Sequence, residues 1–187
     1  DLREDGTATE IVTKTVEAFG GLDTLVLNAA QQIAQPTLSD LTMKQVHDTF
    51  KVNIISMFET VKAAEEHLKP GSAIITTTSV LSFSPTTPLM NYAATKGAIS
   101  NFTINLSSYF ASKGVRVNGV APGPIWTPLQ LDNGQLAGQL PQFGQNTPLG
   151  RAGQPAELAP IYVLLASDDG SYITGQIYGV TGGEAIN

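Results

Sequence analysis

Apolar residues at helical spacing begin the chain and predict a helix over residues 7–19. The residues that carry this spacing are Ile11, Val12, Val16 and Phe19. Two glycines at positions 20 and 21 end the pattern, as glycine commonly does at the C-terminal end of a helix. A run without polar residues follows at 25–27. It predicts a short strand that is buried on both faces, which is typical of a parallel sheet.

The longest helical pattern begins at Met43. Apolar residues recur from there at steps of three and four, which places them on one face of a helix. They stand at positions 43, 46, 50, 54, 57, 61, 64 and 68, and Pro70-Gly71 end the pattern. Residues 73–79 are rich in β-branched side chains and predict a second strand.

The second half of the chain continues this alternation. Its patterns predict a helix over 91–113, a strand over 115–120, a helix over 154–166 and a last strand over 176–180. Between the third strand and the last helix lie roughly 30 residues rich in Gln, Gly and Pro. A segment of this length without regular structure is usually a lid over a functional site or is disordered.

The order of elements predicts the fold class. Helices and strands alternate along the whole chain, which means crossover connections onto one parallel sheet and an α/β fold. The chain has 187 residues, of which 42% are hydrophobic. This length supports one domain with a sizeable core, so we expect a single domain over residues 1–187.

Charge and composition narrow the function. The chain has 10 Lys and Arg against 16 Asp and Glu, with a net charge of −6, and an acidic surface repels nucleic acid. It has no cysteine and only two histidines, which argues against disulfides, thiol nucleophiles and a metal cage. No apolar run reaches the ~18 residues of a membrane span, and the acidic first residues lack the signal-peptide pattern. We therefore expect a cytoplasmic protein that binds no metal, nucleic acid or membrane.

Ligands of open parallel sheets bind beyond the carboxyl ends of the strands, so the residues after each strand are candidates for chemistry. They are Asn28, Ala29 and Ala30 after the first strand, Ser79 after the second, and Pro122, Gly123, Ile125 and Thr127 after the third. The small residues among them let a planar or phosphorylated ligand approach the backbone. Each of these loops, taken alone, can also be an ordinary tight turn.

Tyr92 and Lys96 stand four residues apart near the start of a predicted helix, so they share one helix face. A nearby ammonium favours the phenolate and lowers the pKa of the phenol from its ordinary value of about 10. A phenol tuned in this way donates or accepts a proton at neutral pH. The sequence therefore predicts an acid–base pair at the mouth of the sheet, with Ser79 thirteen residues before Tyr92.

The same spacing occurs again in Tyr109 and Lys113, so the spacing alone is a weak signal. This second pair lies at the far end of the same predicted helix, away from the strand ends. We expect a structural role for it, with Lys113 suited to the negative end of the helix dipole. His47 and His67 lie on the long predicted helix and are expected to be exposed.

Together, these motifs resemble the short-chain dehydrogenase/reductase family. The matching residues are Tyr92 and Lys96, Ser79, Asn53 within Lys51-Val52-Asn53-Ile54, Asn28-Ala29-Ala30, Pro122-Gly123, and the glycine pattern from Gly175 to Gly183. The resemblance covers essentially all 187 residues. Residues 122–128 and 151–155 are most similar to the branch of glucose/ribitol dehydrogenases and stress-induced aldehyde reductases.

The resemblance implies a Rossmann-like doubly wound parallel sheet. It also implies an oxidoreductase that uses NAD or NADP to interconvert an alcohol with an aldehyde, a ketone or a sugar. In this family pattern Tyr92 is the general acid–base, and Lys96 lowers its pKa and holds the nicotinamide ribose. Ser79 hydrogen-bonds the reacting oxygen, and Asn53 holds a water that passes protons to Lys96. A water-filled kink would also explain an asparagine inside a helix, where it is a poor helix former.

The resemblance assigns the cofactor contacts to three groups of residues. Asn28, Ala29 and Ala30 line the cofactor beside its ribose. Pro122 and Gly123 let the backbone come close to it. Ile125 and Thr127 bind its carboxamide and phosphate side. Hydride then leaves a carbon while a proton leaves the attached oxygen, so a nicotinamide and a tuned phenol suffice without a metal.

Two departures from the family pattern matter. Ala30 stands where the family has glycine, and its methyl group leaves slightly less room for the cofactor to approach the backbone. The glycine-rich dinucleotide turn, which the family carries upstream, occurs nowhere in the chain. Asp1 resembles the residue after the third strand of that upstream unit, where an aspartate touches adenine. Without the unit the strand at 25–27 is an open edge, so we expect the C-terminal part of a longer protein, which intact-mass measurement tests.

Alternatives remain open at this point. The chain can be a catalytically silent fragment, or a structural or assembly domain that keeps the family core without a cofactor. Nicotinamide fluorescence on adding NADH or NADPH separates these hypotheses. A hydrolase is disfavoured because Ser79 has no partner histidine in its sequence context and G-x-S-x-G is absent. Neither the choice between NAD and NADP nor the substrate can be read from these residues.

The expected partners are a small-molecule alcohol or carbonyl substrate and further copies of the chain. The predicted helix over 91–113 has an apolar face that, with the last strand, resembles the tetramer surfaces of the family. This face carries Ala94, Ala98, Phe102 and Leu106. It can equally form part of the intramolecular core, and light scattering decides between the two.

Overall fold

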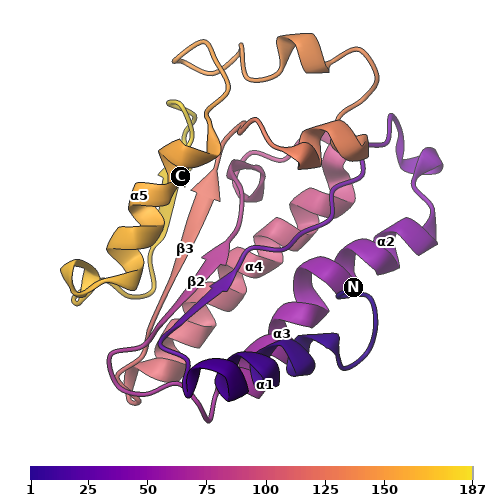
Figure 1. Ribbon diagram of the computed structural model, residues 1–187. Helices are drawn as coiled ribbons and strands as arrows, with labels where there is room; N and C mark the ends of the chain where they lie inside the picture. Colours follow the sequence, from indigo (N-terminus) through magenta and orange to yellow (C-terminus); the bar gives the residue numbers. More distant parts are fainter. Residues whose placement is uncertain (187) are drawn as a thin grey trace.

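The computed structural model describes residues 1–186, with the side chain of residue 133 excepted (Figure 1). The α-helices are α1 (Thr7–Phe19), α2 (Met43–Phe50), α3 (Ser56–Ala64), α4 (Met90–Ala111) and α5 (Pro155–Ala166). The strands are β1 (Thr24–Leu27), β2 (Ala73–Thr77), β3 (Arg116–Pro122) and β4 (Ile177–Val180). The predicted alternation of helices and strands is confirmed.

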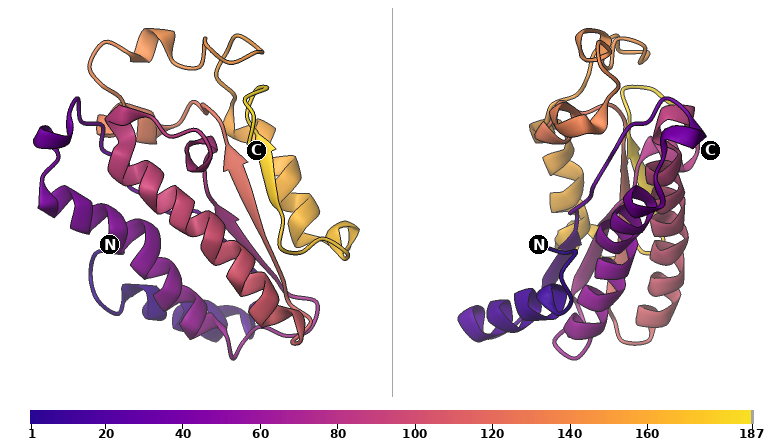
Figure 2. Two further views of the ribbon diagram at one scale, coloured as in Figure 1. Left: turned by 180° about the vertical axis from the view of Figure 1, so that it is seen from behind. Right: turned by 90° about the vertical axis from the view of Figure 1, so that its right-hand side faces the viewer.

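The strands form one parallel sheet in the order β1-β2-β3-β4. Its register pairs Leu25 with Ile74 and Ile74 with Val117, so consecutive strands are neighbours throughout. Helices α1, α3 and α4 cover one face of the sheet and α5 covers the other (Figure 2). Each parallel connection runs through a helix, and the result is the Rossmann-like, doubly wound α/β arrangement that the sequence predicted.

Alternate residues of the strands feed two separate cores, because successive side chains of a strand point to opposite faces. Leu27, Ile74 and Val117 pack with α1, α3 and α4 in the larger core. Ile75 and Val120 pack with Leu165 of α5 in the smaller one. The larger core fixes α4, the helix that carries Tyr92.

Strand β1 lies at the edge of the sheet, and one prediction about it is wrong. The run at 25–27 was expected to be buried on both faces, but Val26 is 45% exposed. Leu27 points into the larger core, whereas no described element covers the opposite face of β1, where Val26 points. The apolar strand β1 thus has one uncovered face, where Val26 points, and one edge that pairs with no described strand.

The long helix predicted from Met43 is continuous but contains a wide turn. Residues Lys51–Ile55 form a π-helical turn between α2 and α3. Asn53 lies at its centre and is fully buried. π-Turns place an extra residue in the helix and commonly mark functional sites. The regular α-helical hydrogen-bonding pattern is therefore interrupted at Asn53, the asparagine that the sequence analysis singled out.

The long segment after β3 contains no α-helix or strand between residues 123 and 154, as expected. It forms short turns at Gln130–Gly134 and Leu140–Gln142, and returns to the sheet through a bridge between Ile125 and Gly153. We call residues 126–152 the lid, because they run across the carboxyl end of the sheet (Figure 1). Within the described residues, no helix is both long and apolar enough to traverse a bilayer.

Candidate active site

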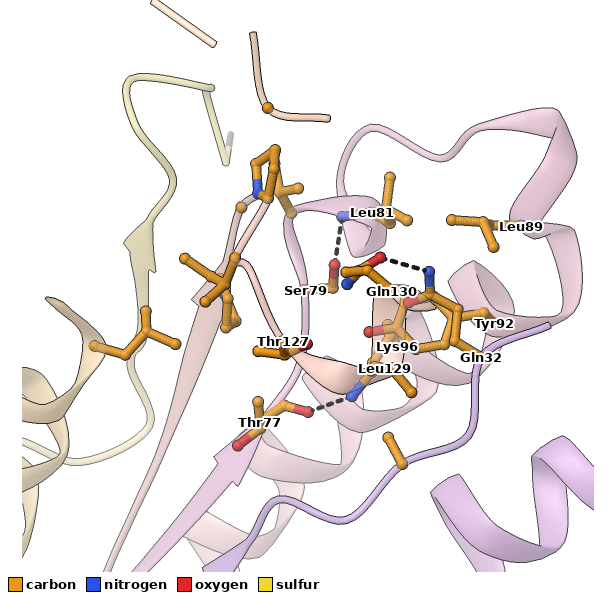
Figure 3. Close-up of a pocket in the computed structure, with 18 of the residues that line it drawn as sticks. Gln32, Thr77, Ser79, Leu81, Leu89, Tyr92, Lys96, Thr127, Leu129 and Gln130 are labelled. Carbon is orange, nitrogen blue, oxygen red and sulfur yellow. Dashed lines mark hydrogen bonds between the residues drawn. The ribbon is translucent and has the colours of Figure 1, made fainter. Parts of the chain in front are cut away.

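A cavity of about 1230 Å³ opens at the carboxyl ends of β1, β2 and β3. It gathers ten of the predicted site residues, although they come from distant parts of the chain. These are Asn28, Ala29, Ala30, Ser79, Tyr92, Lys96, Pro122, Gly123, Ile125 and Thr127. Asn53 and Asp1 do not line the cavity. Figure 3 shows Tyr92, Lys96 and Ser79 within this site, together with the lid residues Leu129 and Gln130.

Tyr92 lies near the start of α4 and is only 7% exposed. It is buried facing the cavity rather than in either hydrophobic core. Burial raises the pKa of the phenol, and a hydrogen bond with Ser79 opposes this rise to a smaller extent. The predicted lowering of the Tyr92 pKa is therefore wrong for this structure, because desolvation disfavours the phenolate.

Lys96 follows one helical turn later and is fully buried, with 1% of its surface exposed. Its Nζ donates a hydrogen bond of 2.7 Å to the backbone oxygen of Thr77 and lies 5.3 Å from the centre of the Tyr92 ring. Burial lowers the pKa of Lys96 to about 7, because the charged ammonium loses its hydration. Tyr92 and Lys96 thus lie on one helix face, as their spacing predicted, but both are more deeply buried than the sequence indicated.

Ser79 follows the end of β2 in extended conformation, and its Oγ accepts a hydrogen bond from the backbone N–H of Leu81 at 3.1 Å. This contact fixes the hydroxyl at the cavity wall. The neighbouring threonines, by contrast, have structural partners: Thr76 pairs with Thr103 and Thr77 with Tyr162. Ser79 is therefore distinguished from the run of hydroxyls before it by its contact with Tyr92.

The side chain of Asn53 connects two elements. Its Oδ1 accepts from the backbone N–H of Gln31 at 2.7 Å, and its Nδ2 donates to the Gln31 oxygen and to Thr95 Oγ1, both at 3.0 Å. These contacts join the loop after β1 to α4, one residue before Lys96. Among the described residues the Asn53 amide makes no hydrogen bond to Lys96. Its part in a proton relay stays a prediction, and its positioning role is evident.

Packing explains why position 123 is a glycine, and the sequence alone did not reveal this. A Cβ atom placed on it would lie 2.7 Å from the backbone oxygen of Thr181, which is too close. Glycine here allows the end of β3 to meet the turn after β4. Pro122, Ile125 and Thr127 line the same wall of the cavity.

Asp1 lies apart from the assembled residues. It is exposed, and its carboxylate hydrogen-bonds the guanidinium of Arg3 at 2.9 Å. Its predicted contact with adenine stays a prediction.

The second tyrosine–lysine pair lies at the opposite end of α4. Tyr109 donates a hydrogen bond of 2.6 Å to Glu65, which also forms an ion pair with Lys113. Tyr109 is 54% exposed, so this cluster is a surface contact between α4 and the end of α3. Of the histidines, His47 is exposed as expected, whereas His67 is half-buried because it lies in the turn after α3.

Several residues of the cavity were not singled out from the sequence. Gln32 and Gln130 line it and are hydrogen-bonded to each other, and Glu184 supplies the one carboxylate among its described lining residues. Burial raises the pKa of Glu184, whose Oε2 is buried without a hydrogen-bond partner in the described residues. Isolated glutamines in loops carry no periodicity or motif, so their location depends entirely on the folding of the loops.

The arrangement defines a class of protein: a Rossmann-like α/β fold with a tyrosine, a lysine and a serine at the mouth of its parallel sheet. Residues 1–184 match the protein-family model described as enoyl-(acyl carrier protein) reductase. The chain belongs to the short-chain dehydrogenase/reductase family, as its motifs indicated.

Individual relatives refine this assignment. The chain is 50% identical to an uncharacterized oxidoreductase, YhxD of Bacillus subtilis, over 98% of this chain and 62% of that protein. It is 44% identical to NADPH-dependent aldehyde reductase 1, chloroplastic, of Arabidopsis thaliana, over 100% of this chain and 65% of the relative. Its fold matches the solved structure of a short-chain dehydrogenase/reductase from Brucella melitensis that is named a glucose/ribitol dehydrogenase. The TM-score is 0.89 at 34% identity, and the match covers 99% of this chain and 74% of the Brucella chain. The chain thus spans less than two thirds of the length of the two curated relatives, YhxD and aldehyde reductase 1.

Proposed function

We propose that this chain carries the catalytic part of an oxidoreductase that transfers hydride between NAD or NADP and an alcohol, aldehyde, ketone or sugar. The observation that supports this most directly is the convergence of Tyr92, Lys96 and Ser79 on one cavity at the carboxyl ends of parallel strands. The NADPH-dependent aldehyde reductase among the relatives supports the cofactor and the carbonyl substrate.

The cavity fits the nicotinamide half of such a cofactor. Asn28 and Ala29 are exposed at its edge, where small side chains leave the backbone of the loop accessible. Lys96 brings ammonium donors to the floor, suited to ribose hydroxyls, and Ile125 and Thr127 supply an apolar wall with a hydroxyl. When bound, the cofactor supplies or takes up the hydride.

The chain's own residues supply the proton. Because burial raises the pKa of Tyr92, its hydroxyl keeps its proton at neutral pH and is ready to donate it to a carbonyl oxygen. Ser79 is placed to hold that oxygen. Lys96, with a pKa of about 7, gains or loses a proton readily near neutral pH. It can therefore return a proton to Tyr92 after the phenol has donated its own. Both side chains are almost completely buried, which limits the access of water to the pair.

Titration of the protein with NADPH and NADH, followed by nicotinamide fluorescence, tests the proposal. We expect enhanced fluorescence and, with an aldehyde added, oxidation of the nicotinamide. A chain that binds neither dinucleotide would be the structural or silent domain that was the alternative. Binding without turnover of any aldehyde, ketone, alcohol or sugar would contradict the assigned chemistry.

A further inference from the structure

The cavity contains a buried carboxamide that the proposed function does not use. Gln32 is 5% exposed and lies in the loop after β1. Burying an amide is costly unless hydrogen bonds compensate for its lost hydration. The partners of this side chain are therefore informative.

The loop that carries Gln32 is fastened to the region of Tyr92 on both sides. On one side, Asn53 joins Gln31 to Thr95 of α4. On the other side, the backbone N–H of Gln35 donates to the oxygen of Pro88 at 2.8 Å, two residues before α4 begins.

Gln32 is thus held between two contacts with the segment on which Tyr92 lies. Figure 3 shows its side chain in the same part of the cavity as Tyr92. The carboxamide is therefore close to where a substrate must present its reacting oxygen.

The present partners of Gln32 belong to the lid. Its Nε2 donates to the backbone oxygen of Gly134 at 2.5 Å and to Oε1 of Gln130 at 3.3 Å. Gln130 in turn accepts from Nε2 of Gln135 at 2.9 Å. All these partners lie on one short turn of the lid and the residue after it, not on the sheet.

Gln32 and Tyr92 line the same cavity, so a substrate that occupies the space beside both of them competes with the lid for the Gln32 donor. Where such a substrate displaces the lid oxygen, the buried Gln32 donor loses its present partner. A substrate oxygen that replaces the lid oxygen restores the hydrogen bond, whereas a substrate without one leaves the donor unpaired.

We propose that Gln32 is a specificity-determining residue whose carboxamide binds a substrate hydroxyl on the carbon next to the reacting carbon. This inference rests on the proposed hydride transfer. The enzyme accordingly prefers 2-hydroxyaldehydes and vicinal diols to plain aldehydes and alcohols of the same length.

Lactaldehyde and propanal test the preference, because they differ only in one hydroxyl beside the carbonyl. We expect kcat/KM to favour lactaldehyde by about tenfold, the value of one hydrogen bond that would otherwise be lost. Gln32→Met, which keeps the length of the side chain without its donors, should abolish this ratio. The same change at Gln176, whose side chain is exposed and distant from the cavity, should leave the ratio intact.

A binding measurement separates this inference from the proposed function. Trp126 is the one tryptophan of the chain, and its ring lies 5.5 Å from Phe143 of the lid, so its fluorescence reports on the lid. We expect propane-1,2-diol to change this signal at lower concentration than propan-1-ol in the unsubstituted protein, and at equal concentration in Gln32→Met.

Each outcome has one meaning. Equal responses to the two alcohols, including no response to either, overturn the role of Gln32 even if hydride transfer is observed. A diol preference that Gln32 controls, without turnover of any substrate, supports the hydroxyl site and refutes the proposed reaction. If Gln32→Met does not fold, Gln32→Leu, which also lacks any hydrogen-bonding group in its side chain, replaces it in both experiments.

Discussion

At the scale of single residues, burial acts on the two ionisable groups of the site in opposite directions. It raises the pKa of Tyr92 and lowers that of Lys96 to about 7, since each group favours its neutral form when dehydrated. At neutral pH Tyr92 therefore keeps its proton, whereas Lys96 changes its protonation state near that pH.

Replacing Tyr92 tests its acid–base role. Tyr92→Phe removes the hydroxyl and leaves the ring, so we expect turnover to fall by about a hundredfold or more while the affinity for NADPH changes little. Initial rates and fluorescence titration measure the two quantities.

Tyr109→Phe is the matched control, because this tyrosine has the same spacing to a lysine but lies on the surface with Glu65. Its turnover should equal that of the unsubstituted protein. If Tyr92→Phe retains most of its activity, the proton-donor role is refuted.

The depressed pKa of Lys96 also predicts how stability depends on pH. Below pH 7 both the folded and the unfolded protein carry this charge, and the folded state bears the cost of burying it. Between about 7 in the folded state and the ordinary 10.5, only the unfolded state keeps the proton, so the free energy of unfolding rises with pH.

Urea denaturation at pH 7 and at about pH 9 measures this rise. In Lys96→Met the part of the rise that comes from Lys96 should disappear, because the titrating group is gone. An identical pH dependence in the two proteins would show that Lys96 titrates normally.

At the scale of elements, the site depends on how a π-turn and a strand end are held. Asn53 connects the loop after β1 with α4, and Gly123 permits contact between β3 and the turn after β4. Gly123 lines the cavity and Asn53 does not, yet the contacts of each set the position of a cavity wall.

Asn53→Leu removes three hydrogen bonds inside the protein. We expect the free energy of unfolding to fall by about 1–3 kcal/mol, because the backbone of Gln31 is left with unpaired polar groups. Asn105→Leu is the control on α4: the exposed Asn105 amide bonds, among the described residues, to Asn101 one turn away, so the change should be within about 0.5 kcal/mol. Equal effects in urea denaturation would contradict the connecting role of Asn53.

Gly123→Ala places a methyl group against the backbone of Thr181. Overpacking of this kind destabilises by about 1–3 kcal/mol. Gly21→Ala has nothing within 4 Å of the added atom and should change thermal stability little. If Gly123→Ala lost cofactor binding without any loss of stability, glycine would be needed there for the cofactor alone.

At the scale of the whole molecule, an apolar area remains exposed on α3 and α4. Phe58 is 53% exposed and stacks on Phe102 with ring centres 4.0 Å apart. The predicted apolar face of α4 is divided: Leu106 is buried in the larger core, whereas Ala94 is exposed. The exposed part is available for another copy of the chain.

We predict a homotetramer that uses this area, in keeping with the family resemblance. Light scattering should give four times the mass of the chain, and Phe58→Glu should lower it, because the carboxylate would be buried without a partner. Phe19→Glu is the control, since Phe19 is 84% exposed at the end of α1. A monomer in the unsubstituted protein refutes the prediction.

The sequence alone determined the order of elements, the parallel sheet and the identity of Tyr92, Lys96 and Ser79. Those features depend on periodicity and on fixed spacing along one helix, which local residues specify. The sequence was wrong about Val26 because burial of an edge strand depends on which elements cover it.

Only the tertiary structure decided the environment of the site. Segments that are distant in the sequence bury Tyr92 and Lys96, and the resulting desolvation, which no local pattern encodes, moves the pKa values of both groups. Gln32 meets Gly134 across a sequence separation of 102 residues, and such a contact exists only after the loops have folded together. Spacing identified the candidate acid–base groups, whereas long-range packing set their burial and the other groups that line the cavity with them.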